Sequence, residues 1–231
     1  MAESSQHGEG PHRGPLSEFA FRLSEYLRDR SAARCTPALI AAPGSAAPLR
    51  VPFVAYTEDC RIFGSMSLER DRLSDVLNAQ DQFVLDDVLV ESLADGRQAR
   101  TDHVTVSRAE LVAVHADGGP RGDAARRIRT ISYPVAVKTG DFEIRGYLHT
   151  RPGTEPLASA RYRKPMIPLT DATIAYRAGA APAYASAGTI VVNREAAEWI
   201  RPIPEHEVRF WDRETARARR QRPGVGSEET A

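Results

Sequence analysis

The chain has 231 residues, and its 31 Lys+Arg balance its 31 Asp+Glu, so the formal net charge is zero. This balance argues against a polyanionic solvating chain and against a strongly basic nucleic-acid coat. The only cysteines, Cys35 and Cys60, form no C-x-x-C pair, which argues against a zinc knuckle or a thioredoxin-like motif. The polar N-terminal segment lacks the apolar core of a signal peptide, and no run of 18 apolar residues occurs. We therefore expect a soluble, cytoplasmic protein.

The N-terminal part is predicted to hold one helix. Residues 1–14 lack the apolar groups that would offset ordering entropy, so a disordered head is expected. Residues 15–33 then repeat apolar side chains at helical spacing, and a Pro/Ala/Gly-rich linker runs to residue 50. Such a helix either packs on the adjacent domain or docks on a partner chain. Its apolar face consists of Leu16, Phe19, Leu23, Tyr26 and Leu27.

From Val51 the apolar period falls to about two, which predicts β-strands. Residues 51–116 form a first strand-rich unit, which begins with a hairpin that turns at Glu58-Asp59. Strands are also expected at 83–93 and 104–114, and Asp95-Gly96 marks a turn between them. A Gly-rich basic linker covers 117–130. A second strand-rich unit follows at 131–203, and a charged, partly disordered tail with one helical stretch covers 204–231.

The two strand-rich units resemble each other in three blocks that occur in the same order. Residues 54–64 align with 135–146, and each block ends in a glycine, Gly64 or Gly146. Residues 83–93 align without gaps with 167–177, which places Asp87 opposite Asp171. Residues 103–114 align with 189–200, which places Arg108 opposite Arg194. This pattern predicts an internal duplication.

Each unit has about five short strands in roughly 65–70 residues. A flat sheet of that size would expose one apolar face and two edges, whereas closure into a barrel hides both edges. The predicted fold is therefore mainly β, with two tandem small five-stranded SH3/Sm-like barrels preceded by one amphipathic helix.

Each unit resembles an Sm-like barrel of the Lsm and Hfq type. The central glycines of the family's bent hairpin match Gly64 and Gly146, and Asp81–Leu85 resembles the D-x-F segment. The last hairpin of the family matches Val104, Val106, Arg108 and Val112 in the first unit, and Ile190, Val192, Arg194 and Ile200 in the second. The resemblance implies edge-to-edge rings. It also implies that Arg108 and Arg194 occupy the position of the family's basic RNA contact, although the simpler and favoured interpretation is that each arginine projects from a turn into solvent.

No sequence motif of a known enzyme class, metal site or cofactor site occurs, so we expect no catalysis, no cofactor and no metal. In a regular strand the adjacent Asp86 and Asp87 point to opposite faces, which argues against a shared metal site. Because Asp87 has a counterpart in Asp171, we expect these residues to close a hairpin in each unit.

The segment 72–83 is long for the connection that it makes. Leu73, Val76 and Leu77 fit one face of a short helix. Two interpretations are open: the helix plugs one end of the first barrel, or it is a surface for a protein partner.

The zero net charge conceals an asymmetry between the units. Residues 51–116 carry 6 arginines and 12 acidic residues, a net charge of −6, whereas 134–203 carry 9 basic and 6 acidic residues, a net charge of +3. Opposite charges suit head-to-tail assembly, so the first hypothesis is a non-enzymatic scaffold or interaction module that binds itself or a protein partner. The alternative is an RNA-binding regulator that uses the basic second unit and the basic linker 117–130, with Arg161, Tyr162, Arg163 and Lys164 as candidate contacts. No membrane interaction is expected.

Overall fold

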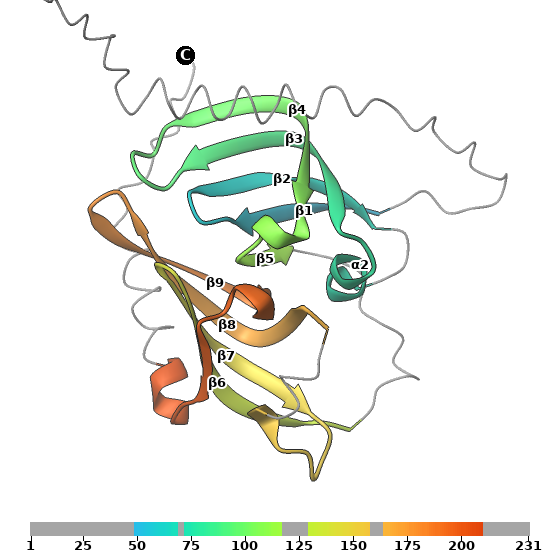
Figure 1. Ribbon diagram of the computed structural model, residues 1–231, viewed down its shortest axis with the longest axis vertical. Helices are drawn as coiled ribbons and strands as arrows, with labels where there is room; N and C mark the ends of the chain where they lie inside the picture. Colours follow the sequence, from blue (N-terminus) through green and yellow to red (C-terminus); the bar gives the residue numbers. More distant parts are fainter. Residues whose placement is uncertain (1–48, 69–71, 117–128, 158–163, 210–231) are drawn as a thin grey trace, which may run out of the picture. The chain divides into compact units, whose positions relative to one another are not determined.

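A computed structural model of the protein describes residues 49–68, 72–116, 129–157 and 164–209 (Figure 1). Several predicted features lie outside these residues. They are the head, the N-terminal helix with Leu16, Phe19, Leu23, Tyr26 and Leu27, most of the basic linker, Arg161, Tyr162 and Arg163, and most of the charged tail.

The described chain is mainly β, as the alternating apolar pattern predicts. The first five strands are β1 (Leu49–Tyr56), β2 (Cys60–Leu68), β3 (Gln82–Ser92), β4 (Gln98–Ser107) and β5 (Ala113–Ala116). The next five are β6 (Ile131–Thr139), β7 (Phe142–Thr150), β8 (Met166–Ala178), β9 (Ala181–Asn193) and β10 (Trp199–Pro202). The short helices are α2 (Leu73–Ala79), η1 (Arg108–Glu110) and η3 (Arg194–Ala196), and residues 205–209 are also helical.

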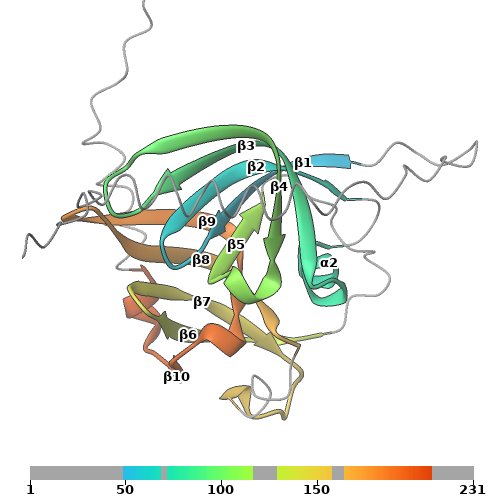
Figure 2. The ribbon, with the colours of Figure 1, turned by 45° about the horizontal axis from the view of Figure 1, so that its top comes forward.

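All ten strands belong to one antiparallel sheet with the order β10-β6-β7-β8-β9-β5-β1-β2-β3-β4 (Figures 1 and 2). The prediction of two closed barrels is therefore wrong, because this sheet is open and ends at β10 and β4. The physical reason is that β5 pairs with β9. The backbone groups of these two edge strands, which barrel closure would have paired within each unit, are paired with each other instead.

The two groups of five strands share one internal order. We call residues 49–116 the first half and residues 129–209 the second half. The first half runs β5-β1-β2-β3-β4, and the second runs β10-β6-β7-β8-β9. Within each half the strand that comes last in the chain lies beside the strand that comes first. Each half therefore has one edge at its last strand and one at its fourth strand.

A glycine and an aspartate interrupt the second and third strands of each half at matching places. The register between β2 and β3 shifts at Gly64, and the register between β7 and β8 shifts at Gly146. Opposite these shifts, Asp87 and Asp171 are the only described residues other than glycine with positive φ, at 50° and 45°. Both lie inside long strands, so the expectation that they close hairpins is wrong.

The positive φ of Asp87 also changes where its side chain points. A regular strand would send Asp86 and Asp87 to opposite faces, as the sequence predicts. Instead, Nη2 of Arg50 lies 2.7 Å from Oδ2 of Asp87 and 3.5 Å from Oδ2 of Asp86. The left-handed residue breaks the alternation, so that both carboxylates approach one guanidinium group.

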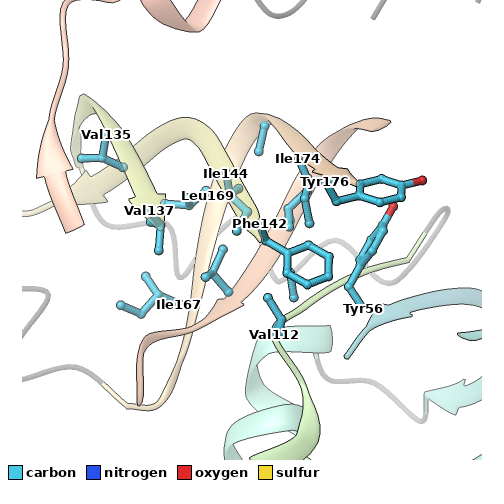
Figure 3. Close-up of a cluster of buried hydrophobic side chains, with 14 of the residues drawn as sticks. Tyr56, Val112, Val135, Val137, Phe142, Ile144, Ile167, Leu169, Ile174 and Tyr176 are labelled. Carbon is cyan, nitrogen blue, oxygen red and sulfur yellow. The ribbon is translucent and has the colours of Figure 1, made fainter. Parts of the chain in front are cut away.

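The core of the second half includes side chains from the first half. Tyr56 on β1 lies 1% exposed among Phe142, Ile174 and Tyr176, and Val112 joins the same cluster (Figure 3). The ring of Tyr56 is 5.4 Å from that of Tyr176 and 6.1 Å from that of Phe142, measured between centroids. This shared core means that the two halves do not bury their apolar surface independently.

Among the glycines that the structure describes, Gly146 is the one at which an added side chain meets the closest obstacle. A Cβ there would lie 2.8 Å from Cβ and 3.1 Å from Cα of Ala172, neither of which can rotate away. We expect Gly146→Ala to lower the free energy of unfolding by about 1–3 kcal/mol, through overpacking between β7 and β8.

Urea denaturation measures this effect. Gly188→Ala in β9 is the matched control, because a Cβ there meets nothing within 4 Å, and its unfolding midpoint should stay close to that of the wild type. Equal midpoints for the two variants would contradict the tight contact between β7 and β8.

Candidate functional site

The joint between the halves is made by backbone pairing of β5 with β9. Ala113 lies opposite Val192 and Val114 opposite Val191, in antiparallel register. At the end of this ladder, the N–H of Asn193 donates to the carbonyl of Val112 at 2.9 Å. Away from this ladder, the N–H of Gly179, in the β8–β9 turn, donates to the carbonyl of Leu93 at 2.6 Å. The two halves are thus joined as neighbouring strands of one sheet.

The Asn193 side chain adds hydrogen bonds across the joint. It is 2% exposed, and its Nδ2 donates to the carbonyls of Leu111 at 2.9 Å and Arg108 at 3.2 Å. Its Oδ1 accepts from the N–H of Glu195 at 3.0 Å, which caps η3. One buried side chain therefore forms hydrogen bonds with backbone groups at the C-terminal end of η1 and at the start of η3.

A half-buried polar cluster links β2 with β8. Nη1 of Arg61 donates to the hydroxyl of Tyr176 at 2.6 Å, and Nη2 lies 2.7 Å from the carboxylate of Glu91. The Arg61 guanidinium also lies 4.6 Å from the centroid of the Phe63 ring. Burial, followed by the nearby Tyr176, raises the pKa of Tyr56 far above its ordinary value, so Tyr56 stays protonated. The cluster serves as a structural contact between the halves.

Helix α2 makes a third side-chain contact across the joint, through Asn78. Its Nδ2 donates to the carbonyl of Met166 at 2.9 Å, and its Oδ1 accepts from the N–H of Met166 at 3.0 Å. The amide side chain therefore pairs with the first residue of β8 as a neighbouring strand would. On the same helix Leu77 is 0% exposed, whereas Leu73 and Val76 are half-buried. The structure thus places part of the predicted partner-binding segment inside the chain's own joint.

Of the predicted RNA contacts, Arg108, Arg194 and Lys164 lie in the described part of the chain, and backbone contacts bring their segments together. The side-chain amide of Asn193, next to Arg194, donates to the carbonyl of Arg108 at 3.2 Å, and the N–H of Arg194 donates to the carbonyl of Pro165 at 2.8 Å. Arg108 and Arg194 begin the equivalent helices η1 and η3, and their side chains are 23% and 26% exposed. The guanidinium of Arg108 forms an ion pair with Asp81 at 2.5 Å, and that of Arg194 lies 3.8 Å from Glu195. Lys164 is exposed at the start of the segment that leads into β8. These ion pairs lower the positive charge that the two arginines offer to a phosphate.

The thiol of Cys60, in β2, is half-buried. Burial raises the pKa of the Cys60 thiol to about 11, and Asp59 adds to the shift, so the thiol is protonated near neutral pH. Among the residues with described positions, no group of three or more His, Cys, Asp or Glu side chains could hold a metal ion.

The sheet ends at the outer edges of β4 and β10, which we call the terminal edges. Within the described ranges no strand pairs with either of them. The terminal edges are the counterparts of the two strands at the joint. Val106 lies opposite Phe83 as Val192 lies opposite Ile167, so β4 corresponds to β9. Likewise, Ala113 lies opposite Tyr56 and Trp199 opposite Lys138, so β10 corresponds to β5.

Comparisons with protein-family models, with curated proteins and with solved structures gave no match to this chain. None of the helices that the structure describes has the length and apolar character needed to cross a membrane.

Sequence reasoning missed the residues that make the joint. Asn193 and its counterpart Ser107 each stand directly before an arginine, a position typical of a helix cap, but the bonds of Asn193 to the other half have no local signal. Asn78 and Met166 are 88 positions apart, and Arg61 and Tyr176 are 115 apart. No spacing rule connects residues at such separations.

We expect Asn78→Ala to destabilise the protein by about 1–2 kcal/mol. The substitution leaves both the N–H and the carbonyl of Met166 without their partner in a half-buried place. Asp75→Ala, on the exposed side of the same helix, should change the free energy of unfolding by less than about 0.5 kcal/mol. Chemical denaturation of the three proteins measures both values. Equal losses in the two variants would show that α2 does not dock through Asn78.

Proposed function

We propose that this protein is a non-enzymatic scaffold that assembles head to tail, with β10 of one copy pairing with β4 of the next. One observation carries the proposal. Within each chain, β5, the last strand of the first half, pairs with β9, the fourth strand of the second half. Their equivalents, β10 and β4, lie at the two ends of the sheet. A second copy is therefore the partner whose edge has the geometry that the joint already uses.

The joint also supplies the register of the proposed pairing. Ala113 opposite Val192 translates into Trp199 opposite Val106, and Val114 opposite Val191 translates into Ile200 opposite Thr105. Trp199 is 36% exposed, which makes it one of the few large apolar side chains of the described surface that face solvent. Covering it with a neighbouring strand would contribute to assembly, because buried tryptophans often dominate binding energy.

The charge distribution supports the same partner. The segment 51–116 has a net charge of −6, and 134–203 has a net charge of +3. In a head-to-tail arrangement the acidic half of one copy meets the basic half of the next, so the long-range electrostatic interaction is attractive. A side-by-side contact between identical halves would be repulsive.

A closed ring of three copies would place six halves in one continuous sheet. The resemblance of each half to Sm-like units, which form edge-to-edge rings, supports this form of assembly. Because every terminal edge would then be paired, the ring also removes the two edges that expose backbone groups to unspecific association.

We expect wild-type protein to be larger than a monomer at micromolar concentration, and Trp199→Glu to weaken the association by at least about 30-fold. The glutamate places a charge on the terminal edge where the proposal buries an indole. Ile131→Glu is the matched control, because Ile131 is a comparably exposed apolar residue, 42%, that stands in β6 before the part paired with β10. Sedimentation velocity and light scattering over a concentration series measure the two constants.

Raising the salt concentration should weaken the assembly of the wild-type protein, since salt screens the attraction between the acidic and basic halves. The proposal would be contradicted by a wild-type protein that stays monomeric even at concentrations about 100-fold above micromolar. It would also be contradicted if Trp199→Glu and Ile131→Glu changed the association constant equally. Nucleic acid that purifies with a monomer would instead support RNA binding by the basic second half.

A further inference from the structure

The two strands that correspond to each other, β4 and β9, end in different caps. At the end of β4 the Glu110 carboxylate accepts the N–H of Ser107 at 2.8 Å, and the Ser107 hydroxyl accepts from Ala109, which together form a capping box. In the aligned positions of the second half, Asn193 replaces Ser107 and Ala196 replaces Glu110. An alanine has no carboxylate, so it cannot accept the N–H of Asn193.

This difference decides where the backbone donor goes. At the joint, the N–H of Asn193 crosses to the carbonyl of Val112, and its side-chain amide crosses to the carbonyls of Leu111 and Arg108. At the end of β4, the corresponding N–H is held inside the first half by Glu110. The serine that stands there has no amide group to reach a neighbouring strand. The end of β4 thus lacks the three donors that secure the internal joint.

We propose that the Ser107–Glu110 capping box is a guard that keeps the joint between copies weaker than the joint within the chain. This inference rests on the proposed head-to-tail assembly. In that assembly the acceptors on the neighbouring copy are the carbonyls of Ala197 and Glu198, which correspond to those of Leu111 and Val112. Glu110 withholds the Ser107 N–H from them, so the contact between copies is reversible while β5 and β9 stay paired.

The guard also discriminates between the two possible partners of β5. The strands β4 and β9 share their alignment, so β4 of a second copy competes in principle with β9 for pairing with β5. Only β9 ends in a residue that gives its N–H to Val112. The capping box therefore favours pairing of β5 with β9 of the same chain over pairing of β5 with β4 of a second copy. The specificity comes from a hydrogen bond that β4 cannot make, because Glu110 already accepts the donor.

The double variant Ser107→Asn with Glu110→Ala tests the guard by giving β4 the cap of β9. The new asparagine can still cap η1, as Asn193 caps η3, so the fold should be retained, and the urea midpoint checks this. We expect the dissociation constant between copies to fall at least about ten-fold, because donors become available at the contact. Glu195→Ala is the matched control. It removes an exposed carboxylate next to the equivalent cap and should leave the constant within about two-fold of the wild type.

Sedimentation equilibrium of the wild type, the double variant and Glu195→Ala decides between the outcomes. A tighter constant that is lost again when Trp199→Glu is added to the double variant supports the guard at the terminal edge. An unchanged constant in an assembly that Trp199→Glu still disrupts overturns the guard and leaves head-to-tail assembly in place. Monomers in all proteins, the double variant included, overturn both.

Discussion

The pairing of β5 with β9 is the interaction on which the rest of the structure depends. It joins two five-stranded halves into one sheet and brings Tyr56 of the first half into the core of the second. Without it, both strands would expose a row of backbone donors and acceptors, and the apolar surface around Tyr56 and Phe142 would meet water. The same pairing fixes which edges remain at the ends of the sheet, so the proposed assembly follows from the geometry of a contact inside the chain.

Polar side chains give this joint its register. Asn193 and Asn78 each satisfy backbone groups of the opposite half, and Arg61 connects Glu91 with the Tyr176 hydroxyl. Each of these groups would lose its partner if the strands slipped by one residue, because a buried donor or acceptor without a partner is costly. Apolar contacts supply most of the driving force for burial, while these hydrogen bonds select one alignment. The contrast between Asn193 and Ser107 extends the same logic to the terminal edge.

The sequence predicts the strands well, because their apolar alternation is local. The hairpins around Glu58-Asp59 and Gly96, and the helix over Leu73–Ala79, lie where the pattern places them. The matching positions of Gly64 and Gly146 are also readable from the aligned blocks. The prediction of closed barrels is wrong because strand order depends on which sheet edges meet in space. The four residues of β5 and the ten of β4 would have to pair to close the first barrel, and their sequences do not indicate which strand each one pairs with. The residues of the joint could not be predicted from the sequence for the same reason, since their contacts cross from one half to the other.

Disulfide trapping between copies tests head-to-tail pairing most directly. Two variants, Ile200→Cys and Thr105→Cys, each with Cys35→Ser and Cys60→Ser, are mixed and oxidised gently. Residues directly opposite each other in an antiparallel pair have Cα atoms at about 4.5–5.5 Å, within reach of a disulfide. The proposed register predicts a covalent dimer from this mixture and none from Ile200→Cys mixed with Thr101→Cys, which lies four residues away on the same strand. No covalent dimer from the first mixture, or equal yields from both, would contradict the pairing of β10 with β4.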